Sequence, residues 1–282
     1  MTAGIIDFEK PGDDRQPTPA LWGACPRTVL NDLGLGHFIV RDFPGETSDL
    51  PGLPNTGDGT FTYAGDDRAL RLTTGDTANN ALAIYTRPLN KVVRKRNPSH
   101  GLWFETSIRL PSASLSGSAG FFVGLARADG LDDDLVSDTP ADDAAAGLDD
   151  ESVIGFVSRR EDGDITKIDA VYRKGDGSVV TVVEDVTNSH RLEKVSHPGG
   201  VSQTDRTGDV KADEWLKLGV AYNVNTNQVQ YFVRGVLVAR VEVDHTVDQA
   251  NEYGGIICWK TGTTDNRILD VDFFRAAAQY RT

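Results

Sequence analysis

Two aspartates near the C-terminal end of the chain, Asp270 and Asp272, have the residue type and the spacing that hydrolysis of a glycosidic bond requires. Glycosidases use two carboxyl groups, about 5–5.5 Å apart for retention of configuration or ~6.5–9.5 Å apart for inversion. Residues two positions apart on a β-strand share a face at roughly 6.6–7 Å. The other interpretation is an exposed polar face of a strand, because Leu269, Val271 and Phe273 alternate with the pair and would point inward. We favour this second interpretation.

A second candidate for chemistry is an acidic stretch in the middle of the chain, residues 131–151, with eight aspartates and one glutamate. Ca²⁺ is bound by several oxygens that converge on one point. The stretch lacks the alternating aspartates, the glycine and the terminal glutamate of an EF-hand loop. We interpret it as a solvated acidic loop and predict no metal site, with Ca²⁺ binding at this loop as the open alternative.

Other catalytic patterns are missing from the sequence. Neither Cys25 nor Cys258 has a histidine nearby in the chain, and Ser152 lies in no G-x-S-x-G motif. There is no glycine-rich nucleotide-binding motif, and two cysteines are too few for a disulfide framework. The five histidines, which show no spacing typical of a zinc site, are His37, His100, His190, His197 and His245. The sequence therefore predicts that the protein is not an enzyme and has no cofactor.

Four cations close together, Lys91, Arg94, Lys95 and Arg96, form the one basic cluster of the sequence. The whole chain has 29 lysines and arginines against 42 aspartates and glutamates, a formal net charge of −13. A protein this acidic is repelled by nucleic acid and by an anionic membrane surface. We therefore expect neither as a partner, and interpret the cluster as a contact for an acidic protein surface or, alternatively, as a strand end with solvated charges.

Two tryptophans, Trp103 and Trp259, lie in predicted strands and could stack on sugar rings if their side chains are exposed. In residues 101–110, Leu102 and Phe104 begin the face that we expect in the core. We expect the face that begins with Trp103 and Glu105 to be at least partly wet. Loops or a neighbouring molecule could equally cover both tryptophans, so a bound glycan is an alternative rather than the main expectation.

The elements that would position these residues are β-strands. The clearest pattern lies between residues 214 and 243, where apolar and polar residues alternate in three runs separated by turn residues. Similar runs recur at about 8–15-residue spacing without helical periodicity, which favours an all-β fold, an antiparallel β-sandwich over residues 37–282. The other runs lie at 37–43, 60–64, 69–73, 81–86, 101–110, 120–128, 152–159, 165–173, 179–183, 255–260 and 267–275.

The first part of the chain, residues 1–36, is rich in proline and glycine and has no strand or helix periodicity, so we predict an extended N-terminal arm. Its apolar side chains need a surface to lie on, either the sandwich of the same chain or a neighbouring subunit. We take the arm as a contact with a partner. The sequence shows no secretory signal and no membrane span, which indicates synthesis in a cytoplasm. The apolar residues of the arm are Ile5, Ile6, Phe8, Leu21 and Trp22.

The order of the predicted strands resembles that of concanavalin A-like, laminin-G-like jelly rolls over residues 37–278. A recurring feature of these folds is a hairpin with an aromatic residue, a glycine and a small or branched residue, here residues 231–239. The motifs that carry the resemblance are GLWFETSIRL, GFFVGLARADG, VIGFVSRREDGD, EWLKLGVAYN, YFVRGVLVAR and ILDVDFFRAA. Jelly-roll glucanases usually have a Glu-x-Asp-x-(x)-Glu strand, and this sequence contains no such triplet.

More narrowly, the sequence resembles virion proteins of tailed bacteriophages that combine a jelly roll with an acidic Asp/Ala-rich loop and a terminal D-x-D-aromatic-aromatic-R-A-A. This resemblance implies a structural role, such as decoration or cementing of the capsid. The implied location is the virion, after synthesis in the host cytoplasm, and the implied partners are the major capsid protein and further copies of this chain, as a trimer or dimer. A carbohydrate-binding module is the alternative, and a glycosidase or lyase a third. The matching positions are 124–126, 132–143, 162–164 and 270–277.

Overall fold

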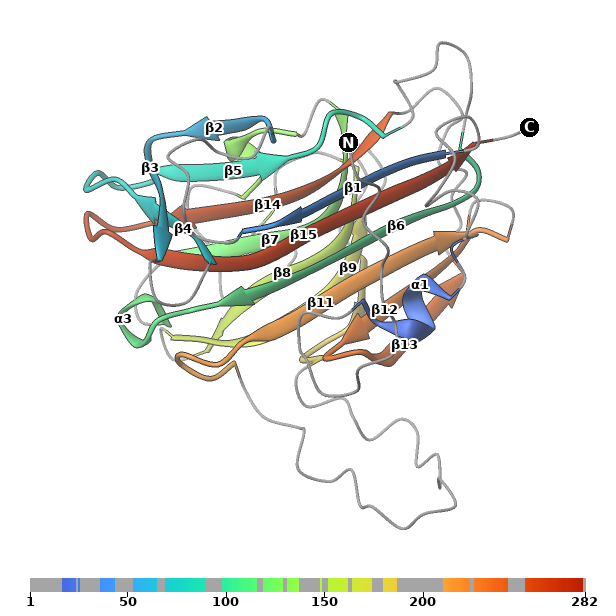
Figure 1. Ribbon diagram of the computed structural model, residues 1–282. Helices are drawn as coiled ribbons and strands as arrows, with labels where there is room; N and C mark the ends of the chain where they lie inside the picture. The colour runs from blue at the N-terminus through green and yellow to red at the C-terminus, as the bar shows by residue number, and fades with distance from the viewer. Residues whose placement is uncertain are drawn as a thin grey trace.

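The protein folds into two antiparallel β-sheets that pack face to face, as the computed structural model in Figure 1 shows. The fold is therefore the β-sandwich that the strand pattern predicts. In the described part of the chain, no helix is long and apolar enough to cross a membrane. The structure describes residues 17–23, 25, 36–43, 53–64, 69–89, 98–115, 119–128, 131–136, 148, 152–161, 164–173, 180–186, 210–223, 226–242 and 252–280.

The first sheet, called sheet A below, has its two longest strands at the centre, side by side and antiparallel (Figure 1). These strands are β6 (Pro98–Arg109) and β15 (Ile268–Tyr280). The sheet has the order β13-β12-β11-β6-β15-β4-β3, and β1 pairs with the same edge of β15 as β4 does. The other strands are β1 (Gly36–Asp42), β3 (Gly59–Ala64), β4 (Ala69–Thr74), β11 (Leu216–Asn223), β12 (Gln228–Val233) and β13 (Val236–Glu242).

The second sheet, sheet B, has the order β10-β9-β8-β7-β14-β5-β2. Its strands are β2 (Asn55–Gly57), β5 (Ala81–Tyr85), β7 (Ala119–Arg127), β8 (Val153–Glu161), β9 (Asp164–Arg173), β10 (Val180–Val183) and β14 (Tyr253–Thr261). The described helical turns are α1 (Pro19–Trp22), α3 (Ser112–Leu115) and the 3₁₀ turn η2 (Asp133–Leu135).

Each predicted strand has an observed counterpart, and the three runs between residues 214 and 243 form the meander β11, β12 and β13. The reversal between β12 and β13 is a tight turn in which Arg234 and Gly235 both have positive φ, 52° and 80°. Only β2 has no predicted counterpart, because Asn55–Gly57 contains no apolar residue. Inward side chains of both sheets form one core, in which the Phe104 and Phe274 rings meet edge to face at 5.1 Å.

A β-bulge in β15 corrects one sequence prediction. The pairing with β6 shifts between Val271 and Phe273, so the inward face changes phase at this point. Leu269 and Val271 point into the core as expected, but Phe274 takes the next core position in place of Phe273. Phe273 is buried on the other face of sheet A, where the Arg275 guanidinium lies 4.1 Å from the centre of its ring.

The acidic stretch is less solvated than the sequence predicts. In its described part, residues 131–136 and 148, four apolar side chains are buried on the outer face of sheet B: Leu131, Leu135, Val136 and Leu148. Val136 and Leu148 form an antiparallel bridge, so the two ends of the stretch lie together. Two buried cations of sheet B hold these ends, because Lys260 Nζ donates to the Val136 carbonyl at 2.9 Å and Arg173 Nη1 to the Leu148 carbonyl at 3.3 Å.

Candidate functional site

The outer face of sheet A carries two completely buried carboxylates, Glu105 on β6 and Asp270 on β15, both 0 % exposed. Burial of a charged group is unfavourable unless charged or hydrogen-bonding partners surround it. Both carboxylates have such partners, and strand register supplies them. Asp270 stands directly opposite Arg71 of β4 and Arg109 of β6, and Glu105 stands opposite Arg275 of β15.

Asp270 is held by both arginines. Arg71 donates from Nε to Oδ1 at 2.7 Å and from Nη2 to Oδ2 at 3.0 Å. Arg109 donates to Oδ2 from Nη2 at 2.6 Å and from Nε at 3.2 Å. Arg109 also lies over the ring of Trp215, 4.7 Å from its centre, which is a cation–π distance. Both oxygens of Asp270 are therefore committed to tying β4, β15 and β6 together. The expectation of an exposed polar face at Asp270 and Asp272 is wrong, because the two residues are 0 % and 6 % exposed.

Glu105 binds a segment from the beginning of the chain, residues 17–25, called the N-terminal segment below. The backbone N–H of Thr18 donates to Oε1 at 3.0 Å and to Oε2 at 3.3 Å. The indole Nε1–H of Trp22 donates to Oε2 at 2.7 Å, and Arg275 Nη1 lies 3.6 Å from the same oxygen. Charge-assisted hydrogen bonds of this kind are stronger than neutral ones. One carboxylate thus fixes both ends of α1.

The sequence of the N-terminal segment favours this local turn. Pro19 stands at the first helical position, where its missing N–H and fixed φ are tolerated. The carbonyl of Thr18 accepts from the backbone N–H groups of Leu21 and Trp22, at 3.1 and 3.0 Å. The turn places Leu21 and Trp22 on one side, toward sheet A, where they are 0 % and 3 % exposed.

The apolar side chains of the segment fill a matching surface on sheet A. Leu21, Trp22 and Cys25 pack with Trp103, Ala221, Phe232 and Ala277, and Trp22 meets the Phe38 ring edge to face at 5.6 Å. Leu21 sits where Gly219 leaves space, because a Cβ added at Gly219 would lie 2.5 Å from Leu21 Cδ1. Figure 1 shows α1 in front of the end of sheet A that β11, β12 and β13 form.

Of the predicted contact residues in the arm, the structure places two. Leu21 and Trp22 pack on the sandwich of their own chain, the first of the two options that the sequence left open. The other three, Ile5, Ile6 and Phe8, lie outside the described residues, as do all four cations of the basic cluster, Lys91, Arg94, Lys95 and Arg96.

Neither predicted sugar-stacking residue presents its ring to solvent. Trp103 is 4 % exposed because the N-terminal segment covers it, and Trp259 is 0 % exposed because its side chain points between the sheets. The Trp259 indole N–H donates to the carbonyl of Arg267 at 3.2 Å. Of the two alternatives that the sequence left open, exposed or covered rings, the structure shows covered rings. The expectation of a wet face at Trp103 and Glu105 is wrong.

The residues that organise this face form no recognisable motif in the sequence. Glu105, Arg71, Arg109 and Arg275 are charged residues within strands of alternating polarity, a pattern that alone predicts only a solvated face. Their opposite signs were a usable signal, but pairing them requires the strand order and the register.

In the described part of the chain, no group of three or more His, Cys, Asp or Glu side chains could hold a metal ion.

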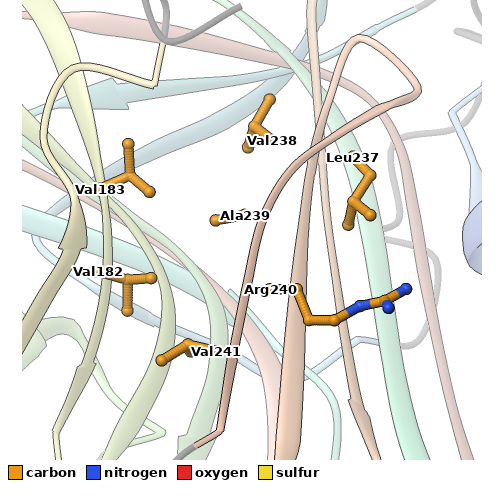
Figure 2. Close-up of a pocket in the computed structure, with 7 residues that line it drawn as sticks. All are labelled: Val182, Val183, Leu237, Val238, Ala239, Arg240 and Val241. Carbon is orange, nitrogen blue, oxygen red and sulfur yellow. The ribbon is translucent and has the colours of Figure 1, made fainter. Parts of the chain in front are cut away.

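A separate open pocket of about 630 Å³, with mostly apolar side chains in its lining, lies where the edge strands β10 and β13 face each other. Figure 2 shows Val182 and Val183 of β10 on one side and Val238 and Val241 of β13 across from them, with the Arg240 side chain pointing away. The lining offers apolar contacts and no cluster of titratable groups. The full lining is Val182, Val183, Leu237, Val238, Ala239, Arg240 and Val241.

Burial of Cys25 makes docking of the N-terminal segment sensitive to alkaline pH. Desolvation raises the pKa of the Cys25 thiol to about 12, whereas a free thiol has a pKa of about 8.5. The docked state therefore binds the proton more tightly, so docking is fully stable below about pH 8.5 and weakens by up to roughly 1.4 kcal/mol per pH unit above it. We expect subtilisin to cleave the segment of the wild-type chain increasingly faster than that of Cys25→Ala, with the rate ratio rising about tenfold from pH 9 to pH 10. A ratio that stays flat would contradict burial of the thiol in the docked state.

Comparison with solved structures identifies the class of fold. A protein of unknown function from Shewanella oneidensis MR-1 aligns with a TM-score of 0.53 at 9 % identity, covering 87 % of each chain. Peanut lectin aligns with a TM-score of 0.54 at 11 % identity, over 87 % of this chain and 99 % of the lectin. The Emp47p carbohydrate recognition domain aligns with a TM-score of 0.51 at 8 % identity, over 88 % of this chain and 99 % of that domain.

The chain is therefore a concanavalin A-like jelly-roll sandwich, the fold of these lectins. No protein-family model and no curated protein sequence matches the chain. Identities this low show the fold alone, and this fold hosts many unrelated functions. The function therefore has to be argued from the surface of this chain.

Proposed function

We propose that the protein is a non-enzymatic structural protein of a tailed-bacteriophage virion, a jelly roll that binds the capsid and stabilises it. The observation that carries the proposal is how the chain uses its terminal motif, residues 270–277, which resembles that of such virion proteins. Asp270 ties three strands together, Arg275 pairs with Glu105, and Ala277 packs under the N-terminal segment. Asp270 and Arg275 of the motif therefore hold the scaffold, which supports a structural rather than a catalytic role for these two residues.

The proposed partners are the major capsid protein and further copies of this chain, as a trimer or dimer, on the virion. Closed symmetry multiplies weak contacts into strong overall binding. The formal charge of −13 makes an acidic body. The basic cluster, Lys91, Arg94, Lys95 and Arg96, is the proposed contact with an acidic patch of the capsid, and Ile5, Ile6 and Phe8 are proposed apolar contacts.

Binding to purified phage heads tests this proposal. Wild-type protein should bind heads saturably, at a fixed ratio to the major capsid protein, and a variant with the four basic-cluster residues changed to glutamate should bind at least tenfold more weakly. The matched control reverses one exposed cation of the sandwich, Lys211→Glu, whose side chain is 58 % exposed in a weak surface pair. Heads that take up no protein at any concentration would overturn the proposal.

A carbohydrate-binding role is the second candidate, and one observation favours it. Beyond the N-terminal segment, the outer face of sheet A carries the partly exposed Trp215 beside Arg109, with Arg71 nearby on the other side of Asp270. An aromatic ring next to guanidinium groups can contact a sugar, by stacking and by hydrogen bonds. Glycan arrays with wild type and Trp215→Ala test this candidate: binding that the variant loses supports it, and an array without any bound glycan removes it.

A further inference from the structure

We infer that the outer face of sheet A around Glu105 and Gly219 is a peptide-binding site, and that it can receive the N-terminal segment of a second copy of this chain. This inference concerns contacts between copies and does not depend on the capsid proposal. The site already holds such a segment in the single chain, so the ligand is known by sequence: a turn with a backbone N–H, a leucine and an indole N–H at fixed positions.

The polar contacts between Glu105 and the N-terminal segment are specific. Glu105 is 0 % exposed and accepts from two donors of the segment that are four residues apart, the Thr18 backbone and the Trp22 indole. A carboxylate accepts hydrogen bonds and cannot donate them when ionised. The site therefore selects a segment with N–H groups at these two positions.

The surface of sheet A matches the segment in shape. Gly219 forms the floor under Leu21, since a Cβ there would lie 2.5 Å from Leu21 Cδ1 and no closer than 3.4 Å to any other atom outside its chain neighbours. The missing side chain therefore serves the docked leucine and nothing else nearby. Phe38 of β1 provides the edge-to-face contact for Trp22. The apolar cluster that Leu21, Trp22 and Cys25 join thus draws on six strands of sheet A, β1, β6, β11, β12, β13 and β15.

The segment can leave sheet A without disturbing the strand pairing of the sandwich. The described part of the segment is a single turn that pairs with no strand, so its departure breaks no ladder of either sheet. The hydroxyl of Thr18 is 1 % exposed and has no hydrogen-bond partner in the described structure, which costs about 1–3 kcal/mol and weakens docking. A segment that shares no backbone ladder with the sheets, and that leaves one buried hydroxyl without a partner in the described structure, is able to leave and return.

The connection between the segment and β1 is long enough for the segment to dock on a neighbouring copy. Ten residues, 26–35, connect Cys25 to Gly36, and a chain of that length can span up to roughly 33–36 Å. Docking in the same chain needs far less, because the Trp22 and Phe38 rings are only 5.6 Å apart. The connection therefore also allows docking on a neighbour, where all contacts would be the same. Exchange of an identical element between copies is a low-cost route to oligomers.

Two full-length variants test the exchange directly. Gly219→Val blocks the leucine position but keeps the segment, and valine suits a strand; Trp22→Ala spoils the segment but keeps the site. Alone, each variant should alkylate quickly at Cys25. When an excess of Trp22→Ala is added, Cys25 of the Gly219→Val copy should become protected at least tenfold, and a mixed dimer should appear by native mass spectrometry. The tryptic peptide of residues 16–27 contains both positions 22 and 25, so its mass tells the copies apart.

A competition experiment on the unmodified chain removes the dependence on these variants. A synthetic peptide of residues 16–27 with serine at position 25, in excess, should raise Cys25 alkylation of the wild-type protein several-fold, and the same peptide with Leu21→Ala should not. Competition together with protection between copies supports the inference. A peptide without effect overturns the binding site, and a peptide that competes while the mixed copies show no protection overturns the second copy as its ligand.

Discussion

Replacement of Asp270 by alanine is expected to lower the free energy of unfolding by about 3–5 kcal/mol, the usual effect of removing one partner from a buried ion pair. The carboxylate is 0 % exposed, and the side chains of Arg71 and Arg109 are 32 % and 12 % exposed. The variant leaves two guanidinium groups beside each other without the negative charge that separates them. Three strands that Asp270 joins, β4, β15 and β6, lose this connection at the same time.

Urea unfolding measured by fluorescence checks this prediction, and the midpoint of thermal unfolding should fall by roughly 6–10 °C. The matched control is Asp265→Ala, which removes another aspartate–arginine pair, Asp265 Oδ2 to Arg267 Nη2 at 3.0 Å, whose carboxylate is 69 % exposed. That control should change the free energy of unfolding by less than about 1 kcal/mol. Equal effects of the two changes would mean that Asp270 does not hold the sheet together.

Replacement of Glu105 by alanine is expected to release the N-terminal segment and to increase alkylation of Cys25 at pH 8 by a factor on the order of 100 to 1,000. The variant removes the acceptor of Thr18 and Trp22 from a buried position, and buried donors without partners are unfavourable. Cys25, whose pKa burial raises to about 12, then becomes an exposed thiol with an ordinary pKa. The sheets themselves should remain folded, since the segment pairs with no strand.

The chain contains its own reference for this measurement. Cys258 on sheet B is 0 % exposed, and desolvation raises its pKa to about 12 as well. Its alkylation should stay slow in Glu105→Ala, whereas global unfolding would expose both thiols together. Glu214→Ala is the matched control, because this glutamate is 49 % exposed and pairs only at the surface. Fast alkylation of both cysteines, or of neither, would contradict a specific role of Glu105 in docking.

The strands could be predicted from the sequence because each carries its own signal. Alternation of apolar and polar residues identifies β6, β11 and β12 within one run of residues, and the turn at Arg234 and Gly235 is equally local. The arrangement of the strands in a jelly roll was predicted only from the resemblance to a known fold, because local patterns do not show which strands pair. The bulge in β15 could not be predicted, because Val271, Asp272 and Phe273 continue the alternation without a break.

The burial of the outer faces could not be predicted, because it depends on contacts between distant residues. Glu105 and Trp103 belong to a face that reads as wet, yet residues more than 80 positions away cover them. Leu21 and Trp22 predict packing on some surface, since apolar residues in an irregular arm need one. The sequence does not indicate which surface that is. In the acidic stretch, the apolar Leu131 and Leu135 likewise predict a buried contact, but the many aspartates around them favour a solvated loop.

The copy number of the protein in purified virions tests the central claim most directly. If the chain is a phage protein as proposed, gradient-purified particles of that phage would be digested, and peptides of this protein and of the major capsid protein would be counted against labelled standards by mass spectrometry. The account predicts many copies per particle, in a fixed ratio to the major capsid protein that persists through repeated gradients. Particles that lack the protein, while it accumulates free in the infected cell, would contradict the proposed role.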